Sequence, residues 1–235
     1  MAQQEFVLKL FEFAILLFAL SLHEASHAWV ASRLGDPTAR MLGRVTLNPI
    51  KHIDPFGTLL VPLIMLFVPA FGGFLIGWAK PTPVTTRNFK NIRRDDFLTT
   101  LAGPGSNALA AVVALLGLLV LKQFGPDSVL AAVLIARGYG QALTGPQPAL
   151  LPLALLLYLA IVLNIFLAVF NLLPLPPLDG SRILREVLPY NAQRVYDSLG
   201  MISLILMLVI GAPIVRMLTA PALAVFNAIL LHGMR

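Results

Sequence analysis

The chain contains no cysteine and few charged residues. Of its 235 residues, 12% are Asp, Glu, Lys or Arg and 58% are apolar, whereas a soluble domain averages about 25% charged and about 45–50% apolar residues. A soluble globular fold would have too few polar residues to cover its surface. The same composition excludes disorder, because a disordered chain needs low hydrophobicity and high net charge. The lack of cysteine removes disulfides and thiolate metal sites.

Long apolar runs make up most of the sequence. They lie at about 6–31, 56–78, 97–121, 150–173 and 199–219, with an apolar tail to 231. A membrane-spanning helix needs about 20 residues, so each run is long enough. We therefore expect an all-α polytopic membrane protein with about five to six transmembrane or re-entrant helical segments. It should form a single integral-membrane domain over residues 1–235, with its core at about 6–185 and C-terminal helices at about 199–231.

The net charge of +6 comes from basic residues in the loops between these runs. In a soluble protein such a charge would suggest nucleic-acid binding. Here Lys and Arg are better explained as residues that hold loops on the cytoplasmic side of a membrane. We expect the lipid bilayer as a partner, and no nucleic acid.

The run at 56–78 contains Pro62, Pro69 and two adjacent glycines, which suit a straight helix poorly. The loops on both sides of it, 33–54 and 79–96, are basic. A full crossing would put one of them outside, against the positive-inside bias, whereas a re-entrant segment or hairpin keeps both on one side. The alternative is an ordinary spanning helix with one basic loop outside.

The segment at about 79–90 is rich in β-branched residues and proline. Proline confines a strand to the edge of a sheet. This segment can form a short membrane-associated β-hairpin or edge strand, and it can equally be a loop.

An HExxH motif, His23-Glu24-Ala25-Ser26-His27, lies inside the first apolar run. Histidines at i and i+4 share one face of a helix and suit two corners of a zinc site. Glu24 is placed to take a proton from a zinc-activated water. Ionisable groups inside a span are costly and mark function. The alternative is a structural histidine pair near the membrane interface. We expect His52 and His232 to be surface or interfacial residues.

Zinc held by two histidines needs another protein ligand and an open position for water. Asp179 is a candidate because it follows the run at 150–173 directly. Three prolines between them prevent a regular helix, and irregular backbone at membrane depth is tolerated when it is buried or lines a water-filled cavity. The alternative is an Asp-Gly turn at a helix end. Three other acidic residues lie in polar segments: Asp127, Glu186 and Asp197.

Three asparagines lie within or at the end of apolar runs. Asn164 and Asn171 are seven residues apart and share one helix face. Such amides can hydrogen-bond a peptide or stabilise an oxyanion, or join helices, which we favour for Asn164. Asn107 follows a Gly-Pro-Gly-Ser stretch and can either join helices or line the site.

Several of these motifs together resemble the site-2 protease family of intramembrane zinc metalloproteases, peptidase family M50. They are HEASH in the first run, AGPGSN in a middle run and NLLPLPPLDG after a later one. The stretches NPIKHIDPFGT and GWAKPTPV are similar to the compact bacterial branch, which has no PDZ or CBS domain. The resemblance covers residues of about 15–185. The longest polar connection, about 122–149, has no room for such a domain.

The resemblance implies one Zn²⁺ per chain, held by His23, His27 and Asp179, with Glu24 as the general base. Asn171 would line the site, and Asn107 matches an asparagine of less defined role. The implied function is intramembrane proteolysis of single-span membrane proteins, cut near the cytoplasmic side of the cell membrane.

Two further expectations concern function. Segment 79–90 can hold an unwound substrate peptide as an added strand. The rival interpretation is a non-proteolytic membrane metal-binding or transport protein, for which a carboxylate such as Glu24 beside the ligands has no clear use. The oligomeric state is not predicted.

Overall fold

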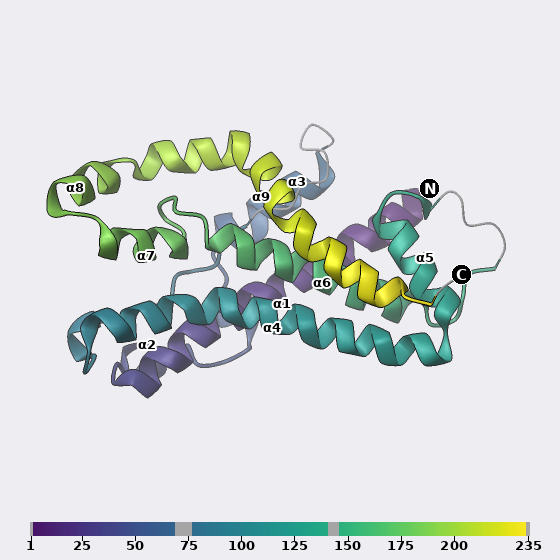
Figure 1. Cartoon of the computed structure of the whole chain (residues 1–235), viewed down its shortest axis with the longest axis horizontal. Coiled ribbons are helices and arrows are strands. Elements are labelled where there is room, and N and C mark those ends of the chain that lie inside the picture. Colours follow the sequence, from purple (N-terminus) through teal and green to yellow (C-terminus); the bar gives the residue numbers. More distant parts are fainter. Residues whose placement is uncertain (1, 69–76, 141–145, 234–235) are drawn as a thin grey trace.

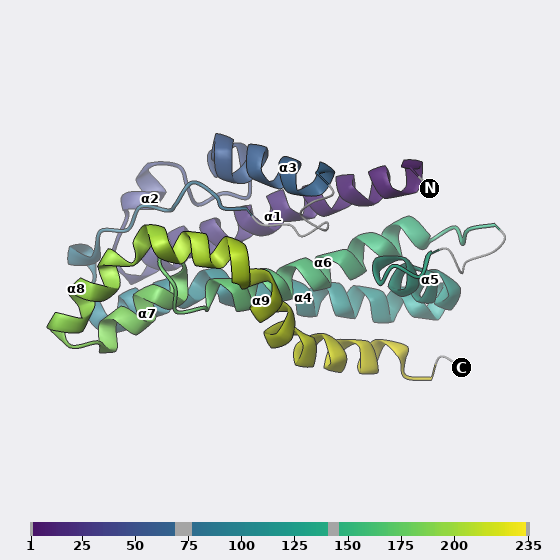
Figure 2. The same cartoon turned by 90° about the horizontal axis from the view of Figure 1, so that it is seen from above.

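The computed structural model describes residues 2–68, 77–140 and 146–233, and this part of the chain is helical without strands. Four long helices lie alongside one another (Figures 1 and 2): α1 (Ala2–Leu34), α4 (Ile92–Phe124), α6 (Leu151–Asn171) and α9 (Gly200–Leu231). Shorter helices join or flank them: α2 (Thr38–Met41), α3 (Val61–Phe67), α5 (Pro126–Ala136), α7 (Asp179–Val187) and α8 (Tyr190–Ser198). The all-α fold predicted from composition is confirmed.

The centre of the bundle is formed by α4, which packs against both α1 and α6. Small residues are fully buried where these helices meet, among them Ala19 on α1, Ala111 on α4 and Ala154 on α6. Small side chains let helix backbones approach closely, which is how helices associate in a bilayer, where burial of apolar surface alone gives little driving force. This close approach positions the polar residues of neighbouring helices within hydrogen-bonding distance.

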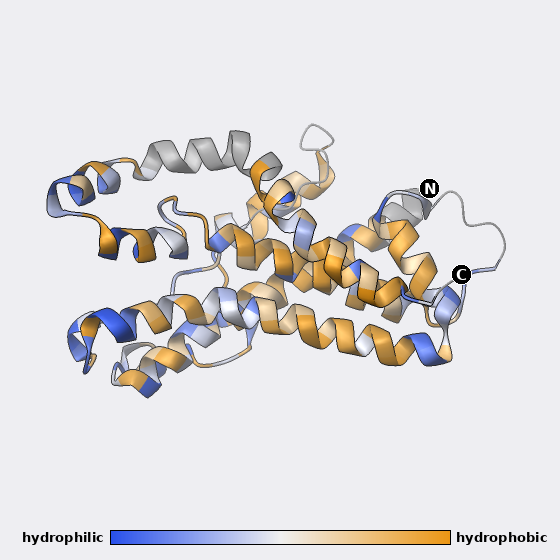
Figure 3. Ribbon diagram, in the orientation of Figure 1, coloured by the Kyte–Doolittle hydropathy of each residue, from blue (hydrophilic) through white to orange (hydrophobic). Residues whose placement is uncertain are grey.

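Three helical segments of the described chain are long and apolar enough to cross a membrane: Ile92–Phe124, Leu151–Asn171 and Ile214–Leu231. Helix α1 matches the run at 6–31 and has the same length as α4, but it carries His23, Glu24 and His27 in its second half. Figure 3 shows apolar residues over most of the bundle and hydrophilic residues gathered at the end where α2, α8 and the start of α4 lie. The molecule is therefore a polytopic membrane-type bundle with one strongly polar end.

The two described ends of the run at 56–78 lie together. The chain enters through a π-helical turn at Pro55–Leu60 and continues as α3. At the other end of the run, the amide of Trp78 donates a hydrogen bond to the carbonyl of Gly57 at 3.0 Å. A full crossing would separate these two residues by about 30 Å. The basic loops before and after this segment therefore lie at the same end of the bundle, as the re-entrant interpretation requires.

Of the two alternatives for segment 79–90, the structure shows the loop and not the strand: the segment is extended with one 3₁₀ turn at Thr86–Asn88, and its prolines offer no ladder donors. Three other expectations from the sequence are corrected. The connection at 122–149 is not simply polar, since it contains α5, whose Val129 and Val133 are buried in the core. The two apolar stretches after 199 form one helix, α9. His52 is not a surface residue, since only 1% of it is exposed.

Candidate metal centre

Helix α1 presents His23 and His27 from one face, as their spacing predicts. Both are buried, and their Nε2 atoms lie 3.0 Å apart. Asp179, at the start of α7, brings its Oδ2 to 3.0 Å from His23 Nε2 and 3.2 Å from His27 Nε2. The three ligand atoms all lie within 4.8 Å of one another. Residues more than 150 positions apart in the sequence thus converge on one point.

Asp179 reaches this point because α6 ends at Asn171 and the proline-rich connection turns back before α7 begins. The start of α7 packs directly on the end of α6. A Cβ at Gly180 would collide with the backbone of Leu172 and lie 2.6 Å from the carbonyl oxygen of Leu173. Glycine at this position is therefore required for the close approach that brings Asp179 to the histidines.

Hydrogen bonds at Nδ1 fix the orientation of both imidazole rings. His27 Nδ1 lies 2.7 Å from the backbone carbonyl of Thr99. A carbonyl can only accept, so this nitrogen carries the proton and Nε2 keeps its lone pair. His23 Nδ1 lies 2.7 Å from Asn107 Oδ1. The amide nitrogen of Asn107 donates to Ala19 O and to Asn164 Oδ1, so the oxygen of Asn107 must face His23, whose Nδ1 donates.

This arrangement leaves three electron-pair donors pointing at one another. Both Nε2 atoms present lone pairs, and Asp179 Oδ2 is buried without a hydrogen-bond partner. Three acceptors held this close together repel one another unless a cation lies between them. Two imidazole nitrogens and one carboxylate oxygen are the donor set of catalytic zinc sites that keep a fourth position open. The residues present therefore fit Zn²⁺.

Gly103 of α4 provides the space beside these nitrogens. A Cβ at this position would collide with His27 Nε2 and lie 2.5 Å from His23 Nε2. Any larger residue would push into the point where the three ligand atoms converge. The glycine of the Ala-Gly-Pro-Gly stretch thus has a specific role at the centre, beyond general helix packing.

Glu24 lies beside this centre without joining it. Its Oε2 accepts a hydrogen bond from the amide of Thr82 at 2.8 Å, and its backbone carbonyl accepts one from Thr82 Oγ1 at 3.0 Å. These contacts hold the carboxylate between α1 and the extended segment at 77–89, which we call the strap. Glu24 follows the first histidine directly and is not part of the group His23, His27 and Asp179, whose ligand atoms lie within 4.8 Å of one another.

The strap is fixed to the rest of the protein by two residues that sequence reasoning did not identify. Arg44 donates to the carbonyl oxygens of Lys51, Lys80 and Pro81. Asp36 accepts hydrogen bonds from the amide of Thr85 at 2.7 Å and from the side chain of Asn88 at 2.8 Å. Neither residue belongs to a recognisable motif, so no sequence signal could have found them.

Burial and hydrogen bonding act in opposite directions on the charge of Asp36. Burial raises the pKa of its carboxyl, but hydrogen bonds from Thr38, Asn88 and Thr85 outweigh that effect and hold the pKa of Asp36 below its ordinary value. The carboxylate is therefore charged at neutral pH and acts as the anchor of the strap.

The three asparagines of the sequence analysis have different surroundings. Asn107 is fully buried and orients His23. Asn164 accepts from Asn107 and donates to Ala160 O of its own helix, as a residue that joins helices would. The amide of Asn171 donates to Leu167 O, also within α6. A role for Asn171 towards substrate stays a prediction.

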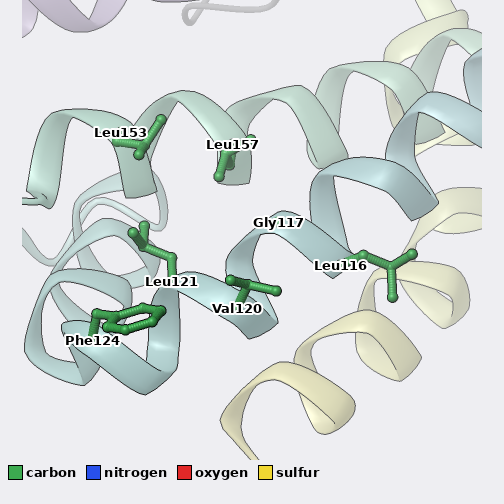
Figure 4. Close-up of a pocket in the computed structure, with 7 residues that line it drawn as sticks. All are labelled: Leu116, Gly117, Val120, Leu121, Phe124, Leu153 and Leu157. Atoms are coloured by element: carbon green, nitrogen blue, oxygen red, sulfur yellow. The ribbon is translucent and has the colours of Figure 1, made fainter.

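A large groove on the bundle lies away from this centre. It has a volume of about 470 Å³ and runs between α4 and α6 (Figure 4), where its lining is entirely apolar. Gly117, at its floor, is 14 residues beyond Gly103, which is about 21 Å along a helix. The lining residues are Leu116, Gly117, Val120, Leu121, Phe124, Leu153 and Leu157. A groove of this kind offers no chemistry.

Comparison with known proteins agrees with the geometry. The model of peptidase family M50 matches residues 11–211. The "Putative zinc metalloprotease YwhC" of Bacillus subtilis is 39% identical over 174 residues, which is 74% of this chain and 67% of that protein. The "Putative zinc metalloprotease Rip2" of Mycolicibacterium smegmatis is 30% identical over 76% of this chain and 57% of its own length.

The Rip2 protein of Mycobacterium tuberculosis strain H37Rv is 34% identical over 194 residues, which is 83% of this chain. The chain spans 57–67% of the length of these three relatives. No solved structure matches it. The family match and the relatives' names confirm the predicted family and its zinc cofactor. With its HExxH helix, apolar bundle and convergent ligand set, the chain therefore belongs to peptidase family M50, the membrane-embedded zinc metalloproteases.

Proposed function

We propose that residues 1–235 act as one intramembrane zinc metalloendopeptidase domain that cuts the transmembrane segments of single-span membrane proteins. The observation that carries this proposal is the convergence of His23, His27 and Asp179 inside an apolar helix bundle, with Glu24 beside them. The names of the relatives support zinc proteolysis. The apolar surroundings of the site support a substrate that is itself in the membrane.

The roles of the residues follow from their contacts. His23, His27 and Asp179 would hold Zn²⁺, which lowers the pKa of a water and polarises the carbonyl that it attacks. Glu24 would accept the proton of the attacking water and later pass it to the leaving amine. Asn107 and the carbonyl of Thr99 keep the two imidazole rings in the protonation state that ligation requires.

A substrate helix must unwind before it can be cut, because each of its carbonyls is already hydrogen-bonded within the helix. The strap is the extended segment next to Glu24. Its amides at Lys80, Thr82 and Thr85 already donate to the protein itself, and its two prolines have none to offer. Few amides of the strap are therefore free to pair with a substrate peptide added as a strand. We propose instead that the strap forms a fixed side of the site next to Glu24.

The candidate ligands lie in the second half of α1 and at the start of α7, and the basic loops that follow α1 and precede α4 lie at the polar end of the bundle (Figures 1 and 3). The positive-inside rule assigns such an end to the cytoplasm. We propose that cleavage takes place near the cytoplasmic side of the cell membrane and that the protein is multi-pass there. No observation favours the transport alternative, and that alternative gives the carboxylate of Glu24 no role.

The test is the variant Glu24→Gln in the purified protein. We expect it to keep about one zinc per chain, because Glu24 is not a ligand, and to lose about 10²–10⁴-fold in the cleavage rate of a single-span reporter helix. Zinc content and cleavage are measured on the same preparation. Glu186→Gln, which changes an exposed carboxylate, is the matched control and should keep both. Cleavage by Glu24→Gln at the wild-type rate would remove Glu24 from the mechanism.

A further inference from the structure

Helix α7, which carries Asp179, is joined to α4 by two ion pairs. Arg182 Nη2 lies 2.6 Å from Asp96 Oδ1, and Arg93 Nε lies 3.8 Å from Glu186 Oε2. The pairing runs in opposite directions on the two helices, because the residue numbers rise along α4 while they fall along α7. The two helices are thus held antiparallel in one register, and Figure 1 shows α7 lying along the first part of α4.

The same register continues into the metal centre. Thr99, whose carbonyl accepts from His27 Nδ1, lies three residues beyond Asp96 on α4. Asp179 lies three residues before Arg182 on α7. Each step is about one helical turn, or roughly 4.5 Å. The ion pair between Asp96 and Arg182 is therefore one turn away from a residue that orients a histidine and from the carboxylate ligand itself.

The two ion pairs differ in their surroundings. The side chain of Asp96 is 10% exposed and that of Arg182 is 39% exposed, and their short contact is a charge-assisted hydrogen bond. A nearly buried carboxylate needs such a partner. Arg93 is 85% exposed and lies farther from Glu186, so this outer pair contributes little. The inner pair is the one that can fix the position of α7.

The position of Asp179 depends on the contact between α7 and α4 more than the positions of the two histidines do. His23 and His27 lie within a long helix, and each has its own hydrogen bond at Nδ1. Asp179 follows a proline-rich connection, and its Oδ2 receives no hydrogen bond from the protein. The position of that oxygen is therefore set by where the start of α7 lies.

We propose that Arg182, held by Asp96, is a positioning residue that keeps Asp179 in place as a zinc ligand. The inference rests on the proposed function, because it takes the convergence of His23, His27 and Asp179 as the zinc site. Arg182 acts through the placement of α7, by its contact with Asp96. The ion pair also joins the element that supplies the carboxylate to the element that orients His27.

The experiment measures the zinc dissociation constant by competition with a chelator, in detergent-solubilised full-length protein. We expect Arg182→Gln and Asp96→Asn each to weaken zinc binding by roughly 10- to 100-fold, as substitutions of residues behind a metal ligand do. The double variant should be no weaker than either single one, because both remove the same contact. Arg182→Lys keeps the charge and should recover part of the affinity.

The matched control is the pair Arg185–Asp197, which also joins α7 to a neighbour but is about half exposed on both sides. Arg185→Gln and Asp197→Asn should keep wild-type zinc affinity. The thermal unfolding midpoint of each metal-free variant is measured as well. A role limited to general stability would lower that midpoint without a selective change in zinc affinity. If Arg182→Gln does not fold, Asp96→Asn and Arg182→Lys give the same comparison.

Three results would overturn the inference: wild-type zinc affinity in Arg182→Gln or Asp96→Asn, equal losses in the control pair, or additive losses in the double variant. The proposed function would fail by different results. It would fail if the wild-type protein bound no zinc, or if His23→Ala bound zinc as tightly as the wild type. If the wild type binds one zinc and Arg182→Gln binds zinc with the same affinity, only the positioning role of Arg182 is contradicted.

Discussion

The two histidines of α1 are oriented for zinc binding by hydrogen bonds to residues that are far from them in the sequence. The side-chain oxygen of Asn107 and the carbonyl of Thr99 each accept a hydrogen bond from Nδ1–H of one ring, which turns both Nε2 lone pairs towards Asp179. The HExxH spacing predicted the shared face of His23 and His27. The motif could not predict the contact with Thr99, because every residue has a backbone carbonyl and the sequence does not show which one accepts the hydrogen bond.

Asp179 was singled out by zinc's need for a third ligand, and the structure brings it to the two histidines. The place of Asn171 at the site, which the resemblance implies, stays a prediction, and its amide donates to Leu167 O within α6. A sequence motif identifies which residue types are present, but the direction of a side chain depends on the register of its helix against its neighbours.

At the residue scale, Gly103 offers a sharp prediction. Gly103→Ala should reduce the zinc content of the purified protein to a small fraction of one per chain, because the added Cβ would collide with His27 Nε2. Gly105→Ala is the matched control two residues later on the same helix, where a Cβ meets nothing within 4 Å. Metal analysis of both variants checks this, and a zinc-replete Gly103→Ala protein would contradict the proposed place of the metal.

At the scale of elements, the long apolar helices were predictable from run length, whereas the short ones were not. Helices α7 and α8 lie in a stretch with mixed polarity, and α5 was hidden in a connection interpreted as polar. The strap was predicted as a strand or a loop. It is an extended loop whose backbone groups are bound by Asp36 and Arg44.

The anchoring of the strap predicts a pH dependence. A lowered pKa means that Asp36 stabilises the fold fully above its ordinary value of 3.8 and that this contribution is lost as the pH falls through the lower, folded-state value. Asp36→Ala should therefore be less stable than the wild type by roughly 1.5–3 kcal/mol at pH 7, and the gap should narrow in acid. Unfolding midpoints of the two proteins between pH 7 and pH 2 measure this gap. A gap that stays constant with pH would exclude the carboxylate as its source.

At the scale of the whole molecule, the segment at 56–78 decides whether the basic loops before and after it lie on the same side of the membrane. Charge bias in the flanking loops pointed to a re-entrant segment, and the hydrogen bond between Gly57 and Trp78 joins its two ends. Residues 69–76 of this segment lie outside the described part of the chain. Composition alone was enough to predict a membrane protein, because that prediction depends on the total content of apolar residues and not on any particular contact.

Topology can be tested by single cysteines, because the chain has none of its own. Met41, the last residue of α2, and Arg87, in the 3₁₀ turn of the strap, are exposed at the polar end, and exposed Tyr139 follows α5 at the other end; each is replaced by cysteine in turn. An impermeant thiol reagent on intact cells should label Tyr139→Cys alone, and all three should react after permeabilisation. Labelling of only one of the two loop positions would show that 56–78 crosses fully. Labelling of both loops without Tyr139→Cys would reverse the orientation.

The measurement that tests the central claim most directly is the zinc content of Asp179→Asn. A neutral amide is a poor zinc ligand, so this variant should retain far less than one zinc per chain and lose peptide cleavage. Asp197→Asn, which changes an exposed carboxylate, should match the wild type in both. If Asp179 were only a turn residue beside Gly180, asparagine would serve equally well there. An active Asp179→Asn protein with a full complement of zinc would therefore contradict the ligand set of His23, His27 and Asp179.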